Sequence, residues 1–252
     1  MSEQPYVKSN VAAGIGTIEF FHPSHNALPG KLLSELAAAI TEAGKNDAVK
    51  VIVLKSGGDR TFCAGASFNE LIAIEDMETG REFFSGFARV INACRKCPKF
   101  IIGRVQGKAV GGGVGVASAV DYCMATKYAS VKLSELHVGI GPFVVGPAVV
   151  RKIGVSAMSQ LAMNADTFQT AEWALQKGLY TEIFEDIPVL DKAVTEMAQK
   201  LLSYNPEAMR QMKAVFWEGT EHWDELLAER AKISGELVLS DYTKKTLAKY
   251  KS

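Results

Sequence analysis

The chain has 252 residues, of which 28 are Lys or Arg and 28 are Asp or Glu, so its formal net charge is zero. This balance is unlike that of a dedicated nucleic-acid-binding protein, because phosphate recognition needs clustered Lys and Arg. The N-terminus carries no apolar signal segment, and no window approaches the roughly 18 apolar residues of a membrane span. The composition therefore predicts a globular protein without nucleic-acid or membrane partners.

The chain has four cysteines, at Cys63, Cys94, Cys97 and Cys123. They are too few and too scattered for a disulfide framework, which predicts reduced thiols and a cytoplasmic location. Cys94 and Cys97 form a CxxC pair, but no second Cys pair or His pair follows at the spacing of a zinc site. We therefore expect no metal site.

The first half of the chain alternates strand and helix patterns. The predicted segments are a strand at 17–21, a helix at 29–45, a strand at 49–54, a loop at 61–67, a helix at 68–94, a strand at 100–105, a short apolar helix ending at 120, and short strands at 123–125 and 130–133. The runs at 49–54 and 100–105 are apolar nearly throughout, which is typical of strands buried on both faces of a parallel sheet.

The second half predicts helices only. Their apolar stripes cover 155–165, 170–178, 188–203, 206–217 and 220–238, followed by a terminal helix with basic residues at Lys244, Lys245, Lys249 and Lys251. No Pro- or Ser-rich linker separates the halves, so we expect one α/β core followed by a helical extension.

Several familiar enzyme motifs are absent from the sequence. Gly113-Val114-Gly115 lacks the third glycine of a dinucleotide-binding fingerprint. No Gly-Lys pair is followed by Ser or Thr, as a P-loop requires, and neither GxSxG nor HExxH occurs. These absences argue against nucleotide hydrolysis, a serine hydrolase and a zinc protease.

Two loops rich in small residues follow the buried strands, at 63–66 and 111–113. Small residues let backbone N–H groups approach a ligand, and two such donors on one oxygen form an oxyanion hole. Glu135 lies between apolar residues at a strand-like end, where desolvation would make its carboxylate a base. Glycine runs also make tight turns, and a lone Glu can be a surface residue, so both interpretations stay open.

The order and spacing of several segments resemble the crotonase, or enoyl-CoA hydratase/isomerase, superfamily from about residue 10 onward. These segments are Asn26-Ala27-Leu28, Phe62 to Ala66, Val105 to Gly113, Asp121, Leu133 to Gly139, Arg151 to Gly154, Ala171, Gly178-Leu179, Asn205-Pro206 and Lys213. The resemblance implies an α/β fold built as a spiral of repeated ββα units. It implies an acyl-CoA-binding core over 1–195 and a helical C-terminal region over 196–252 used for trimerisation, giving a homotrimer or a homohexamer.

The resemblance also implies site residues. The backbone N–H groups of Ala66 and Gly112 would hold the thioester oxygen of an acyl-CoA, and Glu135 would move a proton. The implied substrate and coenzyme A contacts are Asn26, Ala27, Leu28, Ala64, Gly65, Ser67, Phe68, Gly111, Gly115, Val138, Phe143 and Lys245. Coenzyme A would enter as part of the substrate, with no separate cofactor.

Three positions depart from the family pattern. Gly115 stands where hydratases carry their first glutamate, Phe143 replaces the acid of dienoyl-CoA isomerases, and Ser67 replaces a usual Asp. We therefore expect a single-glutamate enoyl-CoA isomerase, in which Glu135 removes a proton from C2 and returns it at C4. The expected apolar walls are Val114, Val138, Phe143 and Val144.

Other activities remain open on the sequence alone. A hydratase acting on fatty or branched acyl-CoA would need Glu135 in both proton-transfer roles, or a second acid such as Glu70 or His137. We expect His137 to be a partly buried structural residue instead. A malonyl-type decarboxylase would need the oxyanion hole alone, and a non-catalytic coenzyme A-binding protein would need neither.

Overall fold

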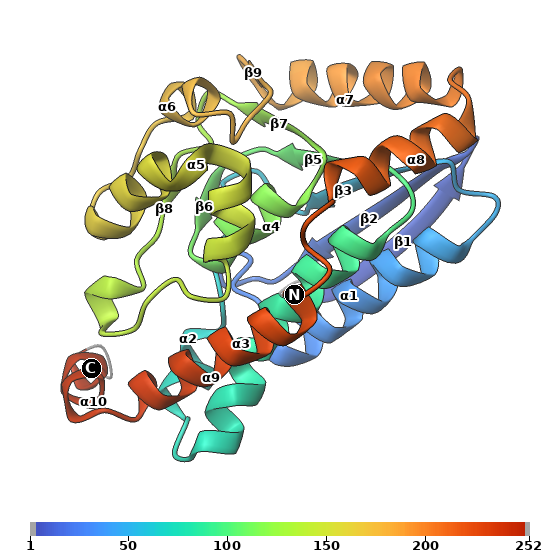
Figure 1. Cartoon of the computed structure of the whole chain (residues 1–252). Coiled ribbons are helices and arrows are strands. Elements are labelled where there is room, and N and C mark those ends of the chain that lie inside the picture. Colours follow the sequence, from blue (N-terminus) through green and yellow to red (C-terminus); the bar gives the residue numbers. More distant parts are fainter. Residues whose placement is uncertain (1–3, 250–252) are drawn as a thin grey trace.

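The computed structural model describes residues 4–249, and within them the strands form two sheets (Figure 1). The strands are β1 (Tyr6–Ala12), β2 (Ile15–Phe21), β3 (Val51–Ser56), β4 (Thr61–Cys63), β5 (Ile101–Val105), β6 (Lys108–Val110), β7 (Tyr122–Thr126), β8 (Val131–Lys132) and β9 (Glu182–Phe184). One sheet has the order β1-β2-β3-β5-β7-β9 and the other β4-β6-β8. Every pair is parallel except the β1–β2 hairpin.

Helices surround the sheets. They are α1 (Gly30–Lys45), α2 (Phe68–Ile72), α3 (Met77–Lys96), α4 (Gly112–Ala119), α5 (Gly146–Met163), α6 (Ala171–Gln176), α7 (Ile187–Leu202), α8 (Pro206–Phe216), α9 (Trp223–Val238) and α10 (Asp241–Ala248), with a 3₁₀ turn at Leu136–Val138. Within the described range, none combines the length and apolar character that a membrane span requires. The α/β fold class is confirmed.

The larger sheet is covered on both faces. On one face, Ile52 and Leu54 of β3 belong to a core cluster shared with α1 and α3. On the other face, Val53 belongs to a second cluster that includes Leu190 and Val194 of α7. Because successive strand side chains point to opposite faces, a strand packed on both sides must be apolar at nearly every position.

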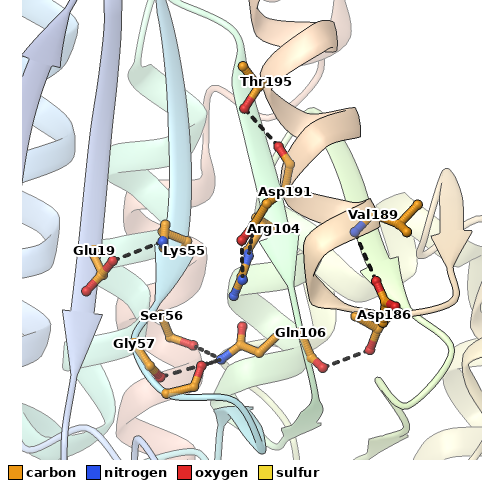
Figure 2. Close-up of polar contacts among 12 residues, drawn as sticks. Glu19, Lys55, Ser56, Gly57, Arg104, Gln106, Asp186, Val189, Asp191 and Thr195 are labelled. Atoms are coloured by element: carbon orange, nitrogen blue, oxygen red, sulfur yellow. Dashed lines mark hydrogen bonds and ion pairs between the residues drawn. The ribbon is translucent and has the colours of Figure 1, made fainter.

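Two buried polar side chains, Arg104 and Gln106, hold neighbouring segments against the larger sheet (Figure 2). Arg104 of β5 is 4% exposed and donates from Nε to Oδ1 of Asp191 on α7 over 2.7 Å. Gln106 donates from Nε2 to Oγ of Ser56 over 2.8 Å and lies near the carbonyl of Gly57. The first pair ties α7 to the sheet, and the second holds the loop that leads from β3 toward β4.

A buried ion pair anchors the C-terminal helices. Lys213 of α8 is 2% exposed and lies 2.6 Å from Oδ2 of Asp121, which also accepts a hydrogen bond from the N–H of Ile101. Farther along the chain, α9 packs closely against α3 at a pair of glycines. A Cβ on Gly80 of α3 would lie only 3.1 Å from Cα of Gly235 on α9. The ion pair therefore holds α8 against the residue just before β7, and the glycine contact lets α9 pack on α3.

Several predicted boundaries were wrong. The single helix expected at 68–94 is two helices, because Asp76 caps α3 by accepting the N–H of Thr79 over 2.8 Å. Strands β1, β4, β6 and β9 were not predicted, and α5 begins at Gly146 rather than at 155. The expected division after residue 195 falls within α7. Lys251 lies outside the described residues.

Candidate active site

A cavity of about 410 Å³ opens where the loop after β4, the start of α4 and the segment after β8 meet. Its lining residues are His22, Ser24, Ala27, Ala64, Gly65, Ala66, Ser67, Phe68, Asn69, Leu71, Phe83, Phe84, Phe87, Val110, Gly111, Gly112, Ser134, Glu135, Val138, Ile140, Gly141, Pro142, Phe143, Val144, Val145 and Ser234. Among these described residues, the titratable side chains are those of His22 and Glu135. The rest of the lining is dominated by apolar and aromatic groups.

Two residues that carry candidate backbone donors, Ala66 and Gly112, line the cavity. The N–H of Leu28 donates to the carbonyl of Gly65, and the N–H of Ser67 donates to the carbonyl of Leu28. This bridge directs residues 65 and 67 toward Leu28, so the N–H of Ala66 points the other way. Gly112 is the first residue of α4, where an N–H has no acceptor within the helix. Two such donors on one oxygen atom would form an oxyanion hole.

Close approaches explain the glycines of the second loop. Gly111 has a positive φ of 53°, and a Cβ there would lie 3.0 Å from Oε1 of Glu135. A Cβ on Gly112 would collide with the ring of Phe87, and one on Gly113 would lie 2.5 Å from the carbonyl oxygen of Cys63. The loop thus places its backbone against the carboxyl of Glu135 and the ring of Phe87.

Glu135 does not lie at a strand end, as the sequence analysis expected, because β8 stops at Lys132. It begins a turn in which its carbonyl accepts the N–H groups of Val138 and Ile140 at 3.2 and 3.0 Å. Its Oε2 is buried and has no hydrogen-bond partner within residues 4–249. This burial raises the pKa of the Glu135 carboxyl to about 7. The carboxyl can therefore exchange a proton near neutral pH.

The space beside Gly115 is filled. A Cβ on Gly115 would lie 2.5 Å from Cγ1 of Val145 and 3.6 Å from Cδ1 of Ile91. Val145 directly precedes α5, and Ile91 lies on α3. Because Val145 is so close, a side chain at position 115 would have to displace it. Gly115 itself does not line the cavity.

Other residues named in the sequence analysis occupy varied places. Ala27, Ala64, Gly65, Ser67, Phe68, Gly111, Val138 and Phe143 line the cavity, whereas Asn26, Leu28, Val114 and Lys245 do not. Asn26 is buried, and its amide donates to the carbonyls of Gly57 and Thr61 at 2.9 and 2.8 Å. Leu28 and Val114 are core residues, and Lys245 is exposed on α10.

The alternative acids lie outside the cavity lining. Glu70 accepts the N–H of Gly30 through Oε2 over 2.9 Å at the start of α1. His137 was expected to be partly buried, but its side chain is 44% exposed and pairs with Asp166. The turn after Glu135 is a 3₁₀ turn rather than a strand, and this geometry carries His137 toward solvent.

The aromatic wall of the cavity, formed by Phe83, Phe84 and Phe87, was not predicted from the sequence. Phe83, Phe84 and Phe87 share one face of α3 and line the cavity, with the first two rings in edge-to-face contact at 5.0 Å. Their i, i+1, i+4 spacing within a helical segment was the available signal. His22 and Ser234 also line the cavity, and no sequence motif marked them.

The four cysteines are buried free thiols. Burial raises the pKa of Cys63, which lies beside the Ala64–Ala66 loop, to about 12. Such a thiol is a poor nucleophile at neutral pH. Within residues 4–249, no group of His, Cys, Asp and Glu side chains is arranged to hold a metal ion.

The family model for enoyl-CoA hydratase/isomerase matches residues 10–251, so the chain belongs to the enoyl-CoA hydratase/isomerase family, the crotonase superfamily. It is 28% identical over 231 residues to a peroxisomal Δ(3,5)-Δ(2,4)-dienoyl-CoA isomerase from Arabidopsis thaliana, covering 85% of this chain and 81% of the relative. It is 30% identical over 197 residues to a crotonyl-CoA hydratase from Syntrophomonas wolfei, covering 78% and 75%.

Solved structures show the same fold. The crystal structure of an enoyl-CoA hydratase from Bacillus halodurans superposes with a TM-score of 0.89 at 22% identity, covering 97% of this chain and 99% of that one. The crotonase-type fold expected from the sequence is thereby confirmed.

Proposed function

We propose that the protein is an enoyl-CoA isomerase in which Glu135 carries the proton. The Glu135 carboxylate takes a proton from C2 of a 3-enoyl-CoA, and the electron pair passes to the thioester oxygen. The double bond then moves from C3=C4 to C2=C3 as the carboxyl returns the proton to C4. The N–H groups of Ala66 and Gly112 hold the developing oxyanion, and removing one such donor typically costs about 3–4 kcal/mol.

The filled space beside Gly115 is the observation that carries this proposal. Hydration needs a group that activates water in addition to a group that handles the Cα proton, and paired carboxylates serve both roles. Here Val145 occupies the place of a second acidic side chain. A single carboxyl is sufficient for isomerisation, because the same group removes and returns the proton.

The environment of Glu135 also suits a proton carrier. With its pKa raised to about 7, the carboxyl is partly ionised near neutral pH, so it can act first as a base and then as an acid. Phe87, Val138 and Phe143 line the cavity beside it. Their apolar surface would keep water from the enolate.

The binding roles are proposals of the same kind. Ala64 would contact the adenine side of coenzyme A through its backbone, and Ala27 and Gly65 would border the thioester arm. Lys245, exposed on α10, would reach the phosphates. Coenzyme A would enter as part of the substrate, and the aromatic cavity favours an uncharged acyl chain.

A hydratase is the second candidate, favoured by the crotonyl-CoA hydratase among the similar proteins. Glu135 would then both direct water to C3 and deliver a proton to C2. Since Glu70 and His137 lie outside the cavity lining, neither supports a two-acid version of this reaction.

Proton NMR in deuterated buffer tests the two candidates. The protein is incubated with 3-hexenoyl-CoA in one sample and with crotonyl-CoA in the other, and Glu135→Gln is the matched variant. We expect the double bond of 3-hexenoyl-CoA to migrate, with a loss of at least about 100-fold in the variant. A 3-hydroxyacyl product from crotonyl-CoA, without migration in the other sample, would overturn the isomerase proposal in favour of the hydratase.

We further propose that the chain forms a trimer or a hexamer in the cytoplasm, with residues 196–252 contributing to assembly. Met212, Val215 and Phe216 of α8 are 45–48% exposed, and such apolar surface commonly marks an interface. The buried free thiols support a reducing compartment. Light scattering after size exclusion would measure the assembly, and a monomer would contradict it.

A further inference from the structure

We propose that Thr243 of the C-terminal helix α10 is a positioning residue for Glu135, acting through a hydrogen bond to the turn that carries the carboxyl. The inference rests on the proposed role of Glu135 as proton carrier. It gives α10, which lies about 100 residues downstream in the sequence, a defined part in the site.

The contact between α10 and the turn is buried and direct. The side chain of Thr243 is fully buried, and its hydroxyl donates to the carbonyl of Gly139 over 2.9 Å. Gly139 has a positive φ of 90°, and a Cβ there would lie 2.5 Å from Oγ1 of Thr243. The backbone at Gly139 therefore approaches α10 as closely as a glycine permits. Figure 1 shows α10 beside the loop that follows β8.

The geometry of the turn connects Gly139 to Glu135. The N–H of Ile140 donates to the carbonyl of Glu135 over 3.0 Å, and the N–H of Gly139 donates to the carbonyl of Leu136 over 3.2 Å. Gly139 thus lies inside a closed loop that begins at Glu135. A displacement of Gly139 is transmitted to the backbone of Glu135 through these two bonds.

The carboxyl depends on this turn for its position. Oε2 of Glu135 has no hydrogen-bond partner within residues 4–249, and the carboxyl makes a hydrogen bond to the backbone of Glu135 itself, so its orientation follows the backbone of the turn. A second contact acts in the same sense, because Leu247 of α10 and Ile140 share a buried cluster. Thr243 and Leu247 therefore secure the distal end of the turn from one helix.

Ser240, at the start of α10, contacts both the backbone and the hydroxyl of Thr243. Ser240 caps the helix by accepting the N–H of Thr243 at 3.3 Å, and its own hydroxyl lies 3.2 Å from Oγ1 of Thr243. The Ser240 hydroxyl donates to the carbonyl of Leu237 over 2.7 Å, and the Thr243 hydroxyl donates to the carbonyl of Gly139 over 2.9 Å. Residue 243 thus combines burial, a capped helix start and a single backbone acceptor on the catalytic turn.

Thr243→Val tests the proposal, because valine keeps the shape and removes the hydroxyl. Turnover is measured with 3-hexenoyl-CoA and with crotonyl-CoA, using whichever the wild type converts. We expect kcat to fall about fivefold to tenfold, as the loss of one buried hydrogen bond suggests, with KM changed less than twofold. The apparent pKa of kcat should also fall, because water would reach the Glu135 carboxyl. His22 is the other titratable side chain that lines the cavity.

Three further variants make the result decisive. Thr243→Ser should restore kcat and its pH profile, because it returns the hydroxyl. Thr246→Val is the matched control, since that hydroxyl donates to Tyr242 within α10, and it should behave as wild type. Should Thr243→Val fail to fold, Thr243→Ala against Thr243→Ser gives the same comparison.

Wild-type kcat and pH profile in Thr243→Val, or no rescue by Thr243→Ser, would overturn the positioning role. This failure is distinguishable from failure of the proposed function. If Glu135→Gln kept full turnover, Glu135 would not be the proton carrier. If Glu135→Gln lost turnover while Thr243→Val kept it, only the role of Thr243 would be wrong.

Discussion

The buried carboxyl of Glu135 should make the protein less stable as pH rises, and Glu135→Gln should remove that effect. Burial raises the pKa from 4.5 to about 7, so between these values the folded chain holds a proton that the unfolded chain releases. The unfolding free energy of the wild type therefore falls with rising pH in this window. At about 1.4 kcal/mol for each pH unit, the full effect is about 3–4 kcal/mol.

Urea unfolding at pH 5 and pH 8, at one fixed protein concentration, measures this effect. Between these two conditions the stability advantage of Glu135→Gln over the wild type should widen by about 2–3 kcal/mol, because part of the effect is already present at pH 5. Glu196→Gln is the control, since this glutamate is 65% exposed on α7, and its difference from wild type should stay within about 0.5 kcal/mol. A pH-independent difference for Glu135→Gln would refute the burial of an ionisable carboxyl.

Two more predictions concern the core beneath the site. Lys213→Met leaves the buried carboxylate of Asp121 without its cation and should cost about 3–5 kcal/mol of unfolding free energy. Lys192→Met, at an exposed position, should cost less than about 0.5 kcal/mol. Equal losses in urea unfolding would contradict the buried pairing of Lys213 with Asp121. Gly115→Ala places a Cβ 2.5 Å from Val145 and should cost about 1–3 kcal/mol of unfolding free energy. The double variant Gly115→Ala/Val145→Ala should recover part of this loss. If Gly115→Ala is as stable as the wild type in urea unfolding, the space beside Gly115 is open.

The central architecture could be predicted because its signals are strong and local. The strands β3 and β5 are buried on both faces, and their apolar runs were found with nearly correct ends. The helices from α6 to α9 were found from their apolar stripes. A strand of three residues, such as β4 or β6, offers too few positions for any periodicity, so those strands were missed.

The details of the site depended on contacts between distant segments. A strand pattern around Glu135 suggested continuation of β8, but the left-handed Gly139 allows a tight turn that Thr243 holds from the other end of the chain. The filling of the space at Gly115 by Val145 is likewise a packing fact that no local pattern reveals. Motif resemblance located the candidate donors and acid. The spacing of Phe83, Phe84 and Phe87 indicates a shared helix face, but only the fold shows that this face lines the cavity.

Exchange of the Cα protons of butyryl-CoA with deuterated solvent tests most directly whether this cavity forms a thioester enolate through Glu135. The saturated substrate can neither isomerise nor add water, so the measurement does not depend on which of those reactions follows. We predict that the wild type catalyses the exchange and that Glu135→Gln slows it by at least about 100-fold. Exchange at the wild-type rate in Glu135→Gln would remove this carboxyl from the chemistry.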